Sequence, residues 1–134
     1  MNKLIAILFA AAALVPAAAM AEVVVVVGAK AAESSMTKEQ VAQFFLGKSS
    51  SMTPIDQADS SPVRAEFYKK VADKDAAQAK ALWSKLVFTG KATMPKEVAD
   101  NAAVKAAVAA NPKAIGYIDK SAVDATVKVV YTAQ

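Results

Sequence analysis

The chain has 134 residues and a formal net charge of +4 at pH 7, and it contains neither histidine nor cysteine. These absences exclude disulfides, the usual zinc, haem and thiolate sites, and catalytic triads built on histidine. HExxH, GxSxG and P-loop patterns are also absent, so we expect no enzymatic activity, no metal and no cofactor. Lysine and arginine residues are scattered singly along the chain, which is not the pattern of a nucleic-acid-binding surface.

Residues 1–21 resemble a secretory signal peptide. Lys3 precedes an apolar run over residues 4–15, and Ala19-Met20-Ala21 fits the small-x-small rule for cleavage before Glu22. The alternative is a membrane anchor, but the run is short and rich in alanine, and no charged stop-transfer residues follow it. We therefore expect an exported, periplasmic protein without a stable membrane anchor.

The 113 residues from Glu22 onward are enough for one domain, over residues 22–134. Residues 23–27 are five valines ended by Gly28, a run typical of a strand buried on both faces. Thr37 and Gln40 have the spacing of a capping box, which predicts a helix that ends near Gly47. Residues 52–57 predict a second strand, with Pro54 indicating a strand end or an edge.

The second half of the chain continues the alternation. Three helices are predicted: one from Pro62 with Ser61 as its cap, one over residues 75–88, and one from Pro95 to about residue 108. Strands follow over residues 114–118 and, with an edge-like partial alternation, 127–131. Strands alternating with helices predict a single three-layer α/β lobe, with a mostly parallel sheet of about four strands flanked by helices.

Four segments in this order resemble the phosphate-binding proteins of ABC transporters. They are FFLGK (44–48), TPIDQADSS (53–61), NPKAIGYI (111–118) and VKVV (127–130). Members of that family have two lobes that close on phosphate, whereas this chain has room for about one. The resemblance therefore implies a single-lobe short form with a periplasmic-binding-protein-like fold.

The resemblance also implies a ligand site at the start of the helix that follows the second strand. Asp59 and Ser61 match the aspartate and the ligand-binding serine of the family motif Asp-Gly-Ser-Gly-Thr, and Ser60 replaces its first glycine. Gln57 stands where the family has a phosphate-pairing arginine, which removes a charge and a bidentate donor. Arg64, in the first helical turn, is the candidate to compensate for that loss.

Replacements of the second glycine by Pro62 and of the threonine by Val63 remove a backbone N–H and a hydroxyl. Two readings of this stretch stay open. As structure, Ser61 and Pro62 start and cap a helix; as function, the same end of the helix with Arg64 holds an oxyanion weakly.

Other conspicuous residues favour structural roles. Trp83 and Phe88 lie at helical spacing and are expected in the core, and Tyr117 is expected to pack with its hydroxyl reaching an edge. Residues 89–91 are interpreted as the end of a helix followed by a loop.

The leading functional prediction is a periplasmic solute-binding-like protein with a weak or altered oxyanion site formed by Gln57, Asp59, Ser60, Ser61 and Arg64. Its candidate partners are phosphate or another oxyanion, and an ABC transporter or another periplasmic protein. The alternative is an interaction or accessory module that has lost its ligand. An enzyme would need two carboxylates converging in a pocket, for example Asp56 with Asp59, and nothing else in the sequence supports that class.

Overall fold

The structure, a computed structural model, describes residues 22–133, so the predicted signal peptide and its cleavage site lie outside the described residues. No helix among those residues is long and apolar enough to cross a membrane. In chain order the helices and strands are β1 (Val23–Gly28), α1 (Lys38–Phe45), β2 (Thr53–Gln57), α2 (Pro62–Ala72), α3 (Ala76–Phe88), β3 (Lys96–Val98), α4 (Asn101–Ala110), β4 (Ala114–Asp119) and β5 (Val127–Thr132).

The strands form one sheet in the order β3-β2-β4-β1-β5. Strand β2 pairs in parallel with β3 and with β4, whereas β1 pairs antiparallel with β4 and with β5. Four of the five strands therefore run in one direction and β1 runs against them. The predicted α/β class with a mostly parallel sheet is confirmed, and β5 lies at an edge as expected.

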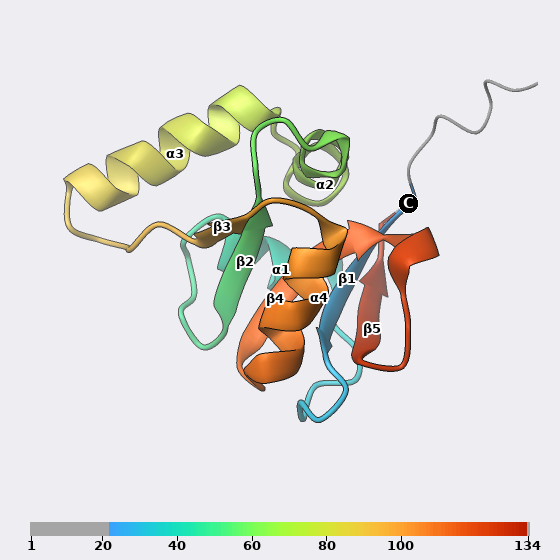
Figure 1. Cartoon of the computed structure of the whole chain (residues 1–134). Coiled ribbons are helices and arrows are strands. Elements are labelled where there is room, and N and C mark those ends of the chain that lie inside the picture. The colour runs from blue at the N-terminus through green and yellow to red at the C-terminus, as the bar shows by residue number, and fades with distance from the viewer. Residues whose placement is uncertain (1–21, 134) are drawn as a thin grey trace, which may run out of the picture.

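Helices cover both faces of the sheet (Figure 1), which confirms the three-layer prediction. The consecutive valines of β1 explain why the strand is buried throughout, because odd-numbered and even-numbered side chains point to opposite faces of the sheet. Val23, Val25 and Val27 belong to the larger core with α1 and α2. Val24 and Val26 belong to the smaller core, where Val104 and Val108 of α4 cover the other face.

The predicted capping box of α1 is present. The Thr37 hydroxyl accepts a hydrogen bond from the Gln40 amide at 3.1 Å, and the Gln40 side chain accepts one from the Thr37 amide at 2.9 Å. Gly47, just past the helix, has φ +74°, a conformation that glycine adopts without the usual steric penalty. Local signals were therefore enough to predict both ends of this helix.

Helix α3 runs away from the sheet (Figure 1) and is anchored through Trp83, which is buried as predicted. The indole Nε1–H donates to the carbonyl oxygen of Phe45 at 2.8 Å. The prediction that Phe88 lies in the core is wrong, since its side chain is 92% exposed. The last residues of α3 therefore extend beyond the part of the helix that packs against the rest of the protein.

The helix predicted from Pro95 is also wrong at its start. Lys96–Val98 instead form the short strand β3 beside β2, and α4 begins at Asn101, where the Asp100 carboxylate accepts a hydrogen bond from the Ala103 amide. Strand β2 consequently lies inside the sheet, so the prediction of an edge strand from Pro54 is wrong. The alternative prediction, that Pro54 lies near a strand end, is correct, since β2 begins at Thr53.

Candidate functional site

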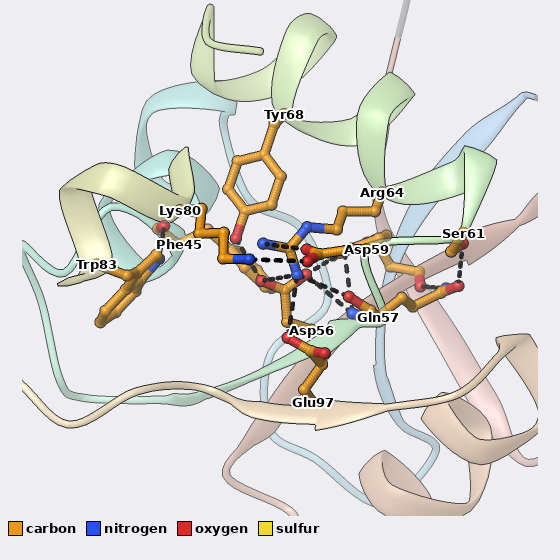
Figure 2. Close-up of polar contacts among 11 residues, drawn as sticks. Phe45, Asp56, Gln57, Asp59, Ser61, Arg64, Tyr68, Lys80, Trp83 and Glu97 are labelled. Carbon is orange, nitrogen blue, oxygen red and sulfur yellow. Dashed lines mark hydrogen bonds and ion pairs between the residues drawn. The ribbon is translucent and has the colours of Figure 1, made fainter. Parts of the chain in front are cut away.

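The candidate site lies where the carboxyl end of β2 turns into α2, and Figure 2 shows its side chains. The strand ends at Gln57 and the helix begins at Pro62, so four residues make the connection. The fold brings Gln57, Asp59, Ser61 and Arg64 together here. Ser60 is exposed in the same turn, and no side-chain hydrogen bond is described for it.

Ser61 occupies the predicted N-cap position of α2, but its side chain does not cap the helix. Its hydroxyl donates instead to the Gln57 side-chain oxygen at 2.7 Å. The prediction of a side-chain cap is therefore wrong. A buried amide four residues earlier attracts the hydroxyl because Gln57 needs a donor within reach.

The side chain of Gln57 is fully buried and all its polar atoms are used within the protein. Its amide nitrogen donates to the carbonyl oxygen of Tyr117 at 2.8 Å and to the side-chain oxygen of Asn101 at 3.0 Å. Together with Ser61 these contacts tie α2 to β4 and to the start of α4. Gln57 therefore replaces a charge with a neutral, internally bonded group.

Arg64 is 4% exposed and lies among three carboxylates. Its guanidinium is 3.4 Å from Asp56, 3.3 Å from Glu97 and 3.6 Å from Asp59, and it donates to the Gln57 carbonyl oxygen at 2.7 Å. Burial by itself lowers the pKa of Arg64, but Asp56 and the neighbouring groups raise it above its ordinary value. Arg64 is thus a charged, internally neutralised residue, and only its Nε has no partner among the described residues.

Asp56, also buried, is the acceptor at the centre of this cluster. Its carboxylate accepts hydrogen bonds from the hydroxyl groups of Tyr68, at 2.6 Å, and of Tyr117. It also accepts one from the backbone N–H of Gln57 at 2.9 Å. These donors and Arg64 replace the hydration that a carboxylate loses on burial. The expected edge contact of the Tyr117 hydroxyl is therefore wrong, since that hydroxyl points into the core.

Asp59 lies at the exposed rim of the cluster. Its carboxylate is 3.1 Å from the Lys80 ammonium of α3, and the hydrogen bond from Lys80, followed by the charge of Arg64, lowers the pKa of Asp59. Because the Asp59 carboxylate is exposed and lies 3.6 Å from the buried Arg64 guanidinium, an anion that approaches Arg64 meets its negative charge.

Sequence reasoning found the turn but missed the partners that decide its chemistry. Asp56, Tyr68, Tyr117 and Glu97 were not assigned to the site. A signal for Asp56 was available, since a carboxylate inside a predicted strand needs a hydrogen-bond or charge partner if the strand is buried. Among residues 22–133, no group of three or more acidic, histidine or cysteine side chains is arranged to hold a metal ion.

Comparisons at the level of sequence give no relative: no protein-family model matches this chain, and no curated protein matches it. Comparison of structures does. An ABC-type phosphate transport receptor from Vibrio cholerae superposes with a TM-score of 0.63 at 18% identity, and the match covers 82% of this chain and 45% of that one.

Two further solved structures agree. A protein described as a phosphate ABC transporter substrate-binding protein, with bound phosphate, from Clostridium perfringens gives a TM-score of 0.65 at 20% identity, covering 82% of this chain and 44% of that one. PstS from Borrelia burgdorferi gives 0.62 at 14% identity, covering 83% and 47%.

The chain therefore has the fold of phosphate ABC transporter substrate-binding proteins, as the sequence resemblance implied. It spans less than half the length of each of the three, which is consistent with a single-lobe short form. These neighbours are transport binding proteins and not enzymes.

Proposed function

We propose that this protein is a periplasmic solute-binding-like protein, related to phosphate ABC transporter substrate-binding proteins, whose oxyanion site is weak. The fold neighbours, one of them with phosphate bound, support the phosphate or transporter connection. The signal-like residues 1–21 support export to the periplasm, with cleavage before Glu22.

The proposal that the site is weak rests on one observation: the side chains that could donate to an anion already bond to other groups of the protein. Ser61 donates to Gln57, and Arg64 faces Asp56, Asp59 and Glu97. An oxyanion at the start of α2 gains the partial charge of the helix end, worth about 0.3–1 kcal/mol at an exposed site, but meets the charge of Asp59. Ser61 and Arg64, with Ser60 beside them, remain the proposed donors to the anion, whereas Gln57 and Asp59 belong to the same site and weaken it.

A variant that unmasks Arg64 tests this proposal. Asp59→Asn removes the exposed carboxylate at the rim, and we expect it to tighten phosphate binding about fivefold, because that negative charge no longer repels the anion. Thermal shift with phosphate and sulfate measures the effect, because a ligand that binds only the native state raises Tm.

Asp73→Asn is the matched control, since Asp73 is likewise exposed and ion-paired, with Lys38 at 3.4 Å, but lies at the other end of α2. The control should leave the phosphate-dependent shift unchanged. If Asp59→Asn gives no gain over Asp73→Asn, an oxyanion does not bind beside Arg64 and the proposed site is wrong.

A second candidate function is an interaction module that no longer binds a ligand. The end of α3 and the loop after it favour it, because Val87, Phe88 and Met94 are large apolar side chains exposed to solvent. Sedimentation of the wild type and of Phe88→Ser over a range of concentrations tests it. Self-association of the wild type that is lost in Phe88→Ser would support this candidate. If both proteins are monomers at every concentration, self-association through α3 is ruled out.

A further inference from the structure

A groove of about 590 Å³ lies at the amino end of β2 and β3, where Thr53 and Lys96 begin these strands. The candidate oxyanion site lies at the opposite, carboxyl end of β2, so the two are separate. The groove is bounded by the loop after α1, the start of β2, helix α3 and the segment that leads into β3. Its volume is within the range of about 300–1,000 Å³ typical of small-molecule sites.

The floor of the groove is apolar and fixed. It contains Phe44, Met52 and Trp83, all largely buried, and the indole cannot turn freely because its N–H is bonded to Phe45. Met94 adds an apolar wall that is 46% exposed. Apolar lining residues beside a partly exposed methionine favour an aromatic or branched hydrocarbon body.

The rim of the groove is positively charged. Lys48, Lys91 and Lys96 line it, and no aspartate or glutamate does. None of these lysines is in an ion pair among the described residues, whereas five other lysines of that part of the chain are. Thr53 and Thr93 belong to the same lining, and each carries a hydroxyl group that can act as a donor.

Backbone hydrogen bonds hold the lysine-bearing loops in place. The Lys48 amide donates to the Gln43 carbonyl oxygen at 2.9 Å, which closes the end of α1. The Lys91 amide donates to the Leu86 carbonyl oxygen at 2.9 Å, which closes the end of α3. The two sides of the groove are therefore ordered before any ligand arrives, which lowers the entropic cost of binding.

We propose that this groove binds a small organic anion with an aromatic or branched apolar body. The acidic group would be held by Lys48, Lys91 and Lys96, and the body would lie on Phe44, Met52 and Trp83. A free tetrahedral oxyanion is much smaller than the groove and has no apolar part to match the floor. Lysine acts as a point charge, so carboxylate, sulfonate and phosphate esters all fit.

The position of Trp83 makes a direct test possible, because it is the only tryptophan in the chain. The probe is anilinonaphthalene sulfonate, an aromatic anion that accepts energy from excited tryptophan, added to the purified exported protein. We expect saturable energy transfer from Trp83 that weakens as salt is raised, since salt screens the lysines. Nile red, an apolar dye without charge, should bind at least about tenfold more weakly, a difference of about 1.4 kcal/mol.

Variants localise the binding. Lys91→Gln with Lys96→Gln should weaken the sulfonate about tenfold, whereas the matched pair Lys30→Gln with Lys69→Gln, exposed lysines outside the lining, should leave it unchanged. Phe88→Ser, also outside the lining, should have no effect. Equal losses in the two lysine pairs, or loss of binding in Phe88→Ser, would overturn the proposal.

Discussion

The hydroxyl of Ser61 illustrates how one buried partner redirects a side chain. In the N-cap position it would ordinarily accept from a helix amide, yet here it donates to Gln57. We predict that Ser61→Ala lowers the free energy of unfolding by about 1 kcal/mol, because the buried amide oxygen of Gln57 loses its hydrogen bond. Urea denaturation measures this, and Ser60→Ala, an exposed neighbour, should be nearly neutral. A Ser61 loss no larger than that of Ser60 would contradict the assignment.

Tyr68 and Tyr117 donate to the same buried carboxylate, and this fixes their protonation. Burial, followed by the charge of Asp56, raises the pKa of both phenols well above the ordinary value of 10.0. A pKa that is higher in the folded state stabilises the protein fully below the unfolded value and progressively less as pH rises past it.

We therefore predict that the stability of the protein falls as pH rises above about 10, and that Tyr68 and Tyr117 ionise only on unfolding. Tyrosinate absorbance and circular dichroism, followed over the same alkaline titration, measure both events. In Tyr68→Phe with Tyr117→Phe, the alkaline loss of stability should shrink. Ionisation of these two tyrosines in the still folded wild type would refute the buried network.

At the scale of elements, α4 is held against the sheet by close contact at Gly116 of β4. A Cβ atom at this position would lie 2.5 Å from Cγ1 of Val104. We predict that Gly116→Ala destabilises the protein by about 1–3 kcal/mol through overpacking.

A double-mutant cycle provides the control for this contact. Val104→Ala removes the atom that an alanine at position 116 would meet, so the double variant should be more stable than the sum of the two single losses implies, by about 0.5–3 kcal/mol. Chemical denaturation of the four proteins gives this coupling. Additive losses would mean that Gly116 does not set the distance between α4 and the sheet.

Sequence patterns predicted the elements whose signals are local. The capping box of Thr37 and Gln40 lies within four residues. The run of valines predicts β1 by itself, because any sheet covered on both faces buries such a strand. The patterns failed where a distant partner decides. Lys96–Val98 pair with β2 although Pro95 looks like a helix start, and Phe88 continues an apolar pattern beyond the packed part of α3. The turn at residues 57–64 was found, but Glu97 and Tyr117 reach it from elsewhere in the chain.

At the scale of the whole molecule, the fold matches part of the phosphate ABC transporter substrate-binding proteins, and the match covers less than half of each neighbour. If an anion binds at the start of α2, the lobe described here would by itself leave one side of that anion in water, where salt screens the helix end and the rim charges. Tight binding would then need a second wall. Micromolar binding by a dimer alone would indicate that a second copy supplies it.

Calorimetric titration of phosphate into a verified monomer tests the central claim most directly, that the donors beside α2 are occupied by the protein itself. The internal bonds of Gln57, Ser61 and Arg64 predict a dissociation constant of about 1 mM or weaker, a binding free energy near −4 kcal/mol. A constant near 1 μM, about −8 kcal/mol, would contradict it.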